Sequence, residues 1–308
     1  MAFTAKDVQT LREMTGVGMM DCKKALTETD GDMSAAAALL REKGMAAAVK
    51  KAGRIAAEGA CFALVADNGV AAVVEINSET DFAAKSDGFQ SFLRDVTAVA
   101  ASEKPKDAEE LKTKPYLNSG RTVGEMLQEK VLTIGENIQI RRTALFAEPV
   151  SAAYVHMGGK IAVLVNLAVS ENLRTNPVVL ELGRDLAMQV AAMKPLWLKK
   201  DDVDSAALAE ERSVFTAQLK EDPKHAGKPQ QVLDKIVDGR IAKYCSEVCL
   251  LEQTYVKEGK MSVSEHVAQT AKELGGSIEV TRFVRFEKGE GISRREDDFA
   301  AEVAAMQK

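Results

Sequence analysis

Residues 60–85 read ACFALVADNGVAAVVEINSETDFAAK, and this pattern predicts a β-hairpin that leads into a helix. Two apolar runs, Ala60 to Ala66 and Val70 to Ile76, flank the turn sequence Asp67-Asn68-Gly69. A turn of this composition between two apolar runs is a strong local hairpin signal. We expect the second run to be a buried strand of a small sheet.

A helix is expected directly after this strand, over residues 82–103, because Thr80 or Asp81 can cap it and apolar residues follow at helical spacing. Phe82 then lies in the first turn of the helix, beside an acidic residue and at the end of the sheet. The local pattern favours Phe82 as a staple that packs the helix onto the core. The alternative is a side chain displayed for function, since element ends carry many functional residues.

The same order of elements recurs in the second half of the chain. Apolar runs at 152–156 and 160–169 flank Gly158-Gly159, which predicts a second hairpin. The helical motif at Arg94 returns at Arg184, 90 residues later and without a gap. The two halves therefore look like duplicates of one unit.

A second pair of matching segments, Ile134–Arg142 and Leu274–Arg282, closes each half, and these lie 140 residues apart. Each ends in a strand with one buried face. The larger offset predicts an insertion of 50 residues in the second half. Its apolar residues recur at helical steps and predict an antiparallel helical hairpin: Leu208, Phe215, Leu219, Leu233, Val237, Ile241 and Tyr244. Such spacing is typical of internal packing, but the length of the hairpin also makes it a candidate for self-association or partner contact.

Both ends of the chain read as helical. Residues 4–44 predict three short helices, and the first begins with a capping box at Thr4. The others are expected over Met19–Thr27 and Met33–Lys43, with Gly44 as the stop. A last short helix, which packs either on its own core or in a partner's groove, has one apolar face: Phe299, Val303 and Met306.

Composition and charge exclude several classes of protein. The 308 residues carry a net charge of -5, whereas nucleic-acid binding needs a basic face, so we expect no direct nucleic-acid partner. Hydrophobic residues make up 46% and charged residues 28%, as in soluble globular proteins of about two domains. We find no signal-peptide core and no apolar run long enough for a membrane span, so no membrane partner is expected. Four scattered cysteines suit reduced, structural thiols, and we expect a cytoplasmic protein.

The sequence lacks the local signatures of enzyme active sites. No Ser-His-Asp or Cys-His signature, P-loop or dinucleotide fingerprint is present, and none of the three histidines, His156, His225 and His266, stands in a metal motif. We therefore expect no cofactor, no metal and no enzyme, but a protein that acts by contacting another protein. Two rivals remain: a thiol enzyme that pairs Cys61 or Cys249 with His156, and a pure protein–protein adaptor.

Five motifs in order identify a family. They are Met14–Leu26, Thr80–Lys85, Ile134–Ile138, Tyr154–Ile161 and Thr281–Phe286. Together they resemble the hallmarks of the translation elongation factor Ts family, and the resemblance covers the whole chain. Several motifs in the right order are far more specific than any one of them alone.

The resemblance implies a guanine-nucleotide exchange factor for elongation factor Tu, binding Tu both with GDP and without nucleotide. In the family, a three-helix module similar to ubiquitin-associated (UBA) domains lies against the nucleotide-binding domain of Tu, and the first core half reaches its bound Mg²⁺. Family members differ in self-association, so a homodimer and a complex of two chains with two Tu molecules both stay open. By this mapping, the residues that dislocate Mg²⁺ are Thr80, Asp81, Phe82 and Ala83. The other expected Tu contacts are Arg12, Lys23, Lys51, Ile134, Gly135 and His156.

Three positions depart from the commoner residues of the family: Ala83 stands in place of Val, Ser86 in place of Asn and Ala162 in place of Gly. They leave the Asp81–Phe82 pair intact, so they bear on affinity rather than on mechanism. The duplication adds a further argument. A staple required by the shared fold should recur in the second half, where residues 168–171 read Ala-Val-Ser-Glu instead. With the resemblance, this moves the preferred role of Phe82 from a staple to a wedge.

We therefore predict an α+β protein with an N-terminal three-helix UBA-like module, a duplicated core of small antiparallel sheets with helices, an inserted coiled-coil hairpin and a C-terminal helix. The expected boundaries are 1–55 for the module and its linker, 56–147 for the first core half, 148–198 and 244–288 for the two parts of the second, 199–243 for the hairpin and 289–308 for the C-terminal module.

Overall fold

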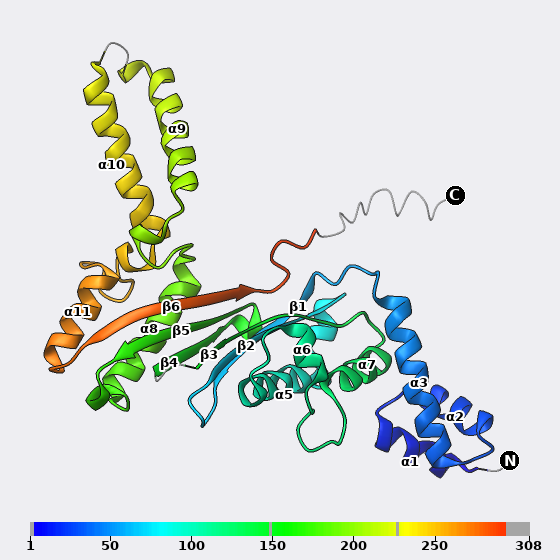
Figure 1. Ribbon diagram of the computed structural model, residues 1–308. Coiled ribbons are helices and arrows are strands. Elements are labelled where there is room, and N and C mark those ends of the chain that lie inside the picture. Colours follow the sequence, from blue (N-terminus) through cyan, green and yellow to red (C-terminus); the bar gives the residue numbers. More distant parts are fainter. Residues whose placement is uncertain (1–2, 148–149, 226–227, 294–308) are drawn as a thin grey trace.

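The computed structural model describes residues 3–147, 150–225 and 228–293 (Figure 1). It confirms a mixed α+β protein with two small antiparallel sheets and helices between their strands. The predicted C-terminal helix around Phe299, Val303 and Met306 lies outside the described residues. The expected domain boundaries stay predictions. Within the described part of the chain, no helix is long and apolar enough to cross a membrane.

The N-terminal module contains the three expected helices, α1 (Ala5–Thr15), α2 (Met19–Glu28) and α3 (Met33–Lys51). Thr4 and Asp7 form the predicted capping box, and Gly16 ends α1 in the left-handed region, with φ 67°. The three helices enclose a small apolar core of their own, lined by Val8, Leu11, Val17, Cys22, Ala25, Leu26, Ala36 and Leu40.

The predicted end of the third helix at Gly44 is wrong, because α3 continues to Lys51. Gly44 instead lies where α3 crosses α7 (Val123–Ile134). A Cβ atom at this position would be 3.5 Å from the carbonyl oxygen of Gln128 and 3.6 Å from Leu132 Cδ2. The glycine therefore permits a close helix–helix contact, through which the module is joined to the core.

The first core half is a three-stranded sheet covered by helices on one face. Its strands β1 (Glu58–Val65), β2 (Ala71–Ser78) and β3 (Gln139–Phe146) pair antiparallel in that order, which confirms the hairpin at Asp67–Gly69. Between β2 and β3 the chain forms α4 (Asp81–Lys85), α5 (Asp87–Glu103), α6 (Ala108–Thr113) and α7. The core lies between this sheet and α5, with Phe89, Phe92 and Val96 buried.

The single helix expected over residues 82–103 is also wrong, since Ser86 divides it into α4 and α5. Ser86 has an extended conformation, with φ −65° and ψ 145°, and its hydroxyl accepts a hydrogen bond from the Phe89 N–H. It thus ends one helix and caps the next. The expected single helix is therefore two helices, the short α4 and the long α5.

The second half repeats the first. Strands β4 (Val150–His156), β5 (Ile161–Val169) and β6 (Ile278–Glu287) form an antiparallel sheet in the order β4-β5-β6, covered by α8 (Pro177–Met193) and α11 (Val263–Glu273). Lys104 and Lys194, 90 residues apart, both end their helices with a left-handed φ. Tyr116 donates to Asp95 at 2.6 Å, and Tyr255 donates to the equivalent Asp185 at 3.1 Å. These matching details confirm the duplication.

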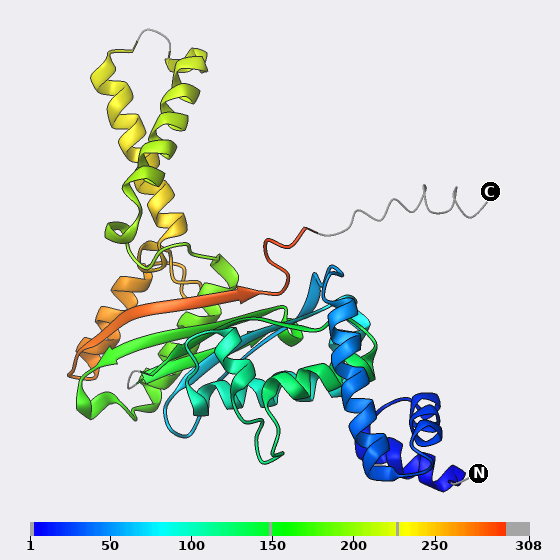
Figure 2. The same ribbon diagram turned by 45° about the vertical axis from the view of Figure 1, so that its right-hand side comes forward.

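The two sheets are stacked face to face between α5 and α8 (Figures 1 and 2). Their contact is mostly apolar and contains Cys61, Ala63, Ala71, Val73, Phe146, Ala162, Leu164 and Phe286. A buried carboxylate, Glu75, lies at its edge and pairs with Arg141 at 3.0 Å and with Arg142 at 2.6 Å. It also accepts the Gly289 N–H at 2.7 Å, which joins the end of the second half to the first.

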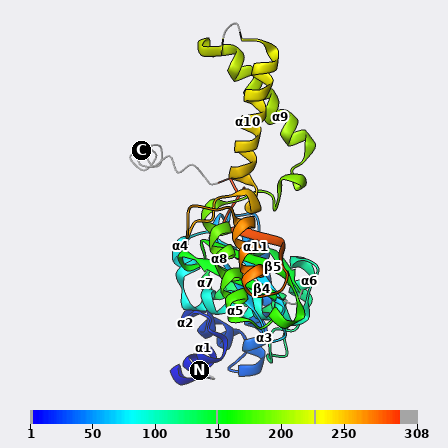
Figure 3. The ribbon, with the colours of Figure 1, turned by 90° about the vertical axis from the view of Figure 1, so that its left-hand side faces the viewer.

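The inserted hairpin consists of α9 (Ser205–Glu221) and α10 (Gln230–Val248), which project from the core at the end opposite the N-terminal module (Figures 1 and 3). All the predicted apolar residues except Leu233 belong to the apolar cluster between its helices and near its base, with Leu219, Val237 and Ile241 buried. Five short 3₁₀ turns complete the described structure: Met157–Gly159, Glu171–Leu173, Lys200–Asp202, Pro223–His225 and Leu250–Glu252.

Candidate functional site

Phe82 is displayed on the surface by the short helix α4. Its side chain is 82% exposed, the highest fraction among the exposed large apolar residues of the described structure, whereas the next residues, Ala83 and Ala84, are buried against the first half. The structure therefore shows that a staple is the wrong interpretation. Thr80 caps the helix, because its Oγ1 accepts the Ala83 N–H at 3.2 Å. Its display at the end of a strand, on a turn fixed by the scaffold, makes Phe82 a candidate binding residue.

Asp81 lies beside Phe82 and carries a local ion pair. Its Oδ2 accepts a hydrogen bond from Lys85 Nζ at 2.6 Å, one helical turn along α4. The hydrogen bond from Lys85 lowers the pKa of the Asp81 carboxyl below its ordinary value, and the charge of Lys288 adds to this effect. Asp81 is therefore ionised at neutral pH and offers a carboxylate to a partner.

The turn before α4 is fixed by two carboxylates, Glu136 and Glu79, each of which accepts hydrogen bonds from the segment that carries the other. Glu136 accepts the backbone N–H groups of Glu79 at 3.1 Å and Thr80 at 3.0 Å, and the Thr80 hydroxyl at 2.6 Å. In return, Glu79 Oε1 accepts the Asn137 N–H at 2.6 Å. The end of β2 and the segment after α7 are thereby fixed to each other. Sequence reasoning did not single out Glu136, although it directly follows the expected contact residues Ile134 and Gly135.

Ile134 and Gly135 form the end of α7 next to this turn. Gly135 ends the helix with φ 87°, a conformation that glycine adopts without strain, and Ile134 is half-buried on the first-half core. An open groove of about 730 Å³ runs past Ile134 and Ala83 to Met14 at the end of α1. The structure therefore brings the expected contact residues Ile134 and Ala83, but not Gly135, to one groove between the N-terminal module and α4.

His156 belongs to the second half and does not line the groove that contains Ile134. It ends β4 and is half-buried, with Nδ1 2.9 Å from the Tyr154 hydroxyl. The next residue, Met157, is exposed, and it lines a pocket of about 180 Å³ together with Asp81 and Lys288. The tip of the second hairpin thus lies beside α4, a proximity that the sequence alone did not predict.

Two of the three expected module contacts are exposed and the third is engaged internally. Arg12 and Lys23 are exposed on α1 and α2, and neither lines the groove that contains Ile134. Lys51 donates from Nζ to the carbonyl oxygen of Val131 on α7 at 3.4 Å. In the free protein Lys51 therefore helps to attach the module to the core.

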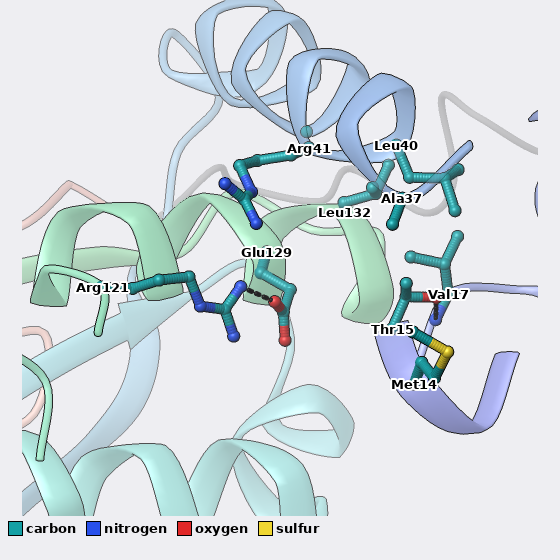
Figure 4. A pocket seen from close by; sticks show the side chains of 10 residues that line it. Met14, Thr15, Val17, Ala37, Leu40, Arg41, Arg121, Glu129 and Leu132 are labelled. Atoms are coloured by element: carbon teal, nitrogen blue, oxygen red, sulfur yellow. Dashed lines mark hydrogen bonds and ion pairs between the residues drawn. The ribbon is translucent and has the colours of Figure 1, made fainter. Parts of the chain in front are cut away.

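A second pocket, of about 210 Å³, lies where α3 of the module meets α7 (Figure 4). Its floor is apolar, formed by Val17, Leu40 and Leu132, and an ion pair between Arg121 and Glu129 at 2.5 Å borders it. This pocket contains none of the residues expected from the sequence to bind a partner.

The cysteines do not support a thiol active site. All four are buried and form no disulfide. Burial and the neighbouring Glu75 raise the pKa of Cys61 far above its ordinary value, and burial with Cys245 beside it raises the pKa of Cys249 to about 12. Both thiols are therefore protonated at neutral pH. Over the ranges that the structure covers, no cluster of His, Cys, Asp or Glu side chains could hold a metal ion.

The chain is similar to known proteins over its whole length. The family described as Elongation factor TS matches residues 79–290. Elongation factor Ts of Clostridium perfringens (strain SM101 / Type A) is 47% identical over 306 residues, which cover 98% of each chain. The proteins of the same name from Magnetococcus marinus and Syntrophotalea carbinolica are 47% identical with 99% of each chain covered, and 45% identical with 100% of each covered. The chain belongs to the elongation factor Ts family.

Proposed function

We propose that this protein is a guanine-nucleotide exchange factor for elongation factor Tu and promotes GDP release during translation elongation. The observation that carries the proposal is the exposed Phe82, displayed beside an ionised Asp81 on a turn fixed by four hydrogen bonds between the end of β2 and the segment after α7. Family membership names the class of protein, and this geometry supplies a device suited to exchange.

An exchange factor needs binding energy rather than bond chemistry. If it binds nucleotide-free Tu more tightly than GDP-bound Tu, linkage requires that it weakens GDP binding by the same factor. An aromatic side chain that enters a Tu pocket open only in the nucleotide-free form provides such a difference. Phe82 is already exposed, so no contact within its own protein has to break first.

Asp81 gives the wedge an electrostatic partner. GDP is held in part by Mg²⁺ and by backbone N–H groups around its phosphates. A carboxylate brought to that site accepts hydrogen bonds from donors that otherwise bind the phosphates, and its negative charge repels the phosphates. We propose that Thr80 and Ala83 fix this pair, and that Ile134, Gly135 and His156 contact Tu around it, with Arg12, Lys23 and Lys51 engaging it from the module.

The proposed action requires no cofactor and makes the protein a binding factor rather than an enzyme. It also places the protein in the cytoplasm, where translation occurs. A homodimer and a complex of two chains with two Tu molecules remain the alternatives for its assembly, and light scattering of the free chain and of its mixture with Tu distinguishes them.

The test is the release of a fluorescent GDP analogue from Tu in a stopped-flow instrument. We expect the wild-type chain to accelerate release strongly and Phe82→Ala to reduce the acceleration. Val178→Ala is a matched control, because Val178 is an exposed apolar residue at the start of α8. A wild-type chain that binds Tu but leaves the release rate unchanged would overturn the proposal and would favour a UBA-like adaptor.

A further inference from the structure

We infer that Glu136 is a positioning residue that holds the Asp81–Phe82 pair in its displayed orientation. The inference rests on the proposed exchange function but concerns a residue outside the contact set. Glu136 makes no ion pair among the described residues, and each of its hydrogen bonds goes to the turn before α4. Its role is therefore to shape that turn.

The hydrogen bonds of Glu136 make the Thr80 hydroxyl an acceptor for the helix that it caps. The Thr80 hydroxyl donates its only proton to Glu136 Oε1, so its lone pairs are left to accept the Ala83 N–H. The other carboxylate oxygen, Oε2, takes both backbone N–H groups that precede the helix. Hydrogen bonds to a carboxylate are shorter and stronger than those between neutral groups.

The helix that carries Phe82 is too short to orient itself. With five residues, α4 is a little more than one turn, and isolated turns of this length are not stable in water. Ser86 separates it from the long helix α5, which contacts α4 at its C-terminal end, where Gln90 Nε2 donates to the Ala84 carbonyl at 2.7 Å. On the N-terminal side, α4 is restrained by the burial of Ala83 and Ala84, by the Ser78 hydroxyl, which donates to the Thr80 carbonyl at 2.9 Å, and by the three hydrogen bonds of Glu136.

In the second half, the end of β5 is joined to the segment before β6 without such a carboxylate. The position 140 residues after Glu136 is Gly276, and Ser170 corresponds to Thr80. There the Ser277 N–H donates to Ser170 Oγ at 2.7 Å, and the Ser170 N–H donates to the Ser277 carbonyl at 3.0 Å. A Cβ atom at Gly276 would lie only 2.5 Å from Ser170 Oγ and 2.6 Å from Leu173 Cδ1, so any side chain there would require both to shift.

The comparison separates the role of Glu136 from the needs of the fold. The second half closes the strand end with two serines and a glycine, and this copy, which lacks the carboxylate, also lacks the Thr-Asp-Phe sequence. Glu136 therefore accompanies the displayed pair rather than the junction itself.

The experiment compares Glu136→Ala and Glu136→Gln with Glu125→Ala. Glu125 is the matched control, because it is a carboxylate at the start of the same helix α7 and caps it by accepting the Thr122 N–H at 2.7 Å. We expect Glu136→Ala to slow the GDP release from Tu that this protein stimulates by about tenfold, since the substitution removes all three hydrogen bonds. Glu136→Gln keeps one acceptor oxygen and should recover part of the loss, whereas Glu125→Ala should leave exchange unchanged.

A double variant tests positioning directly. If Glu136 acts through Phe82, Glu136→Ala should slow release by less than about twofold in a Phe82→Ala background, because residues that act as a unit are not additive. An additive loss, or wild-type release rates for Glu136→Ala, would overturn the inference. If the alanine variant fails to fold, the same additivity test is made with Glu136→Gln.

Amide hydrogen exchange tests the inference independently of Tu. In the free protein, Glu136→Ala should speed exchange at residues 79–83, and Glu125→Ala should do so only near Thr122. Unchanged protection of residues 79–83 would refute the inference whatever the wild-type chain does to Tu. Failure of the proposed function is seen separately, as a wild-type chain without effect on GDP release.

Discussion

Phe82 and Phe89 are two phenylalanines seven residues apart, and replacing each by alanine should separate binding from stability. Phe82 is 82% exposed, whereas Phe89 is fully buried in the first-half core. Phe82→Ala removes few native contacts, so the free energy of unfolding should change by less than about 0.5 kcal/mol. Phe89→Ala leaves a cavity and should lower that free energy by about 3–5 kcal/mol.

The order should reverse for binding to nucleotide-free Tu. Burial of the exposed Phe82 side chain in a partner pocket contributes ~2 kcal/mol. Since 1.4 kcal/mol is a factor of ten, Phe82→Ala should weaken binding by about thirtyfold. Phe89 does not reach the surface, so a folded Phe89→Ala protein should keep nearly normal affinity.

Two measurements check this prediction: urea unfolding followed by circular dichroism, and Tu affinity from stopped-flow association and dissociation rates. A loss of more than about 1.5 kcal/mol of stability in Phe82→Ala would show that the side chain is packed in solution, and would refute the reasoning from exposure. Unchanged affinity of the same variant would refute its role as a wedge.

Three further predictions follow from other parts of the molecule. Gly289→Ala should destabilise the protein by more than about 2 kcal/mol in thermal unfolding, because Gly289 has φ +69° and its new Cβ would lie 2.1 Å from the Ala57 carbonyl oxygen; an unchanged melting temperature would contradict this packing. The Asp81 carboxyl should titrate by NMR with a pKa below 3.8, and Lys85→Ala should raise that pKa; equal titration midpoints in the wild-type and variant proteins would disprove the pairing. The stability that this ion pair contributes is therefore present above the ordinary pKa of the carboxyl and is lost as the pH falls through the lowered pKa. All four cysteines should resist a thiol reagent at pH 8 until urea unfolds the chain, because they are buried and the pKa of Cys249 is raised to about 12; rapid labelling of any of them in the native protein would refute this burial.

Local patterns predicted the elements of this fold well. The turn at Asp67–Gly69, the capping box at Thr4 and the helical steps of the inserted hairpin each depend on neighbours in sequence. The repeated spacings of 90 and 140 residues predicted the duplicated sheets, because equivalent packing positions need equivalent side chains. In these cases the local preference and the final packing agree.

The predictions of two helix ends were wrong for the same reason. Glycine commonly ends a helix, but here α7 packs against Gly44 and α3 continues past it to Lys51. Ser86 is an inconspicuous residue in a helical pattern, yet its hydroxyl starts a new helix. In both cases a contact or a hydrogen bond that the spacing does not reveal decided the outcome.

The candidate site was predictable in its residue types but not in its surroundings. Asp81 and Phe82 drew attention from position and resemblance. Their proximity to Met157 and Lys288, by contrast, depends on how the two sheets stack, and these residues lie more than 70 positions away. The exposure of Phe82 likewise follows from the direction of α4, which Glu136 helps to set from 54 residues further along the chain.

The base of the inserted hairpin has a consequence for how this chain can vary in evolution. The N–H groups of Leu196 and Trp197, before the hairpin, both donate to the Val248 carbonyl, at 2.8 and 3.1 Å, and the Leu250 N–H donates back to Trp197 at 2.9 Å. The segments that enter and leave the hairpin are thus hydrogen-bonded to each other at its base, so the second half does not need the hairpin to bring them together. The hairpin can lengthen, shorten or be replaced by a tight loop with little cost to the core, because a change of loop length between joined ends alters stability only slowly. Its length can therefore change independently of the sheets that carry it.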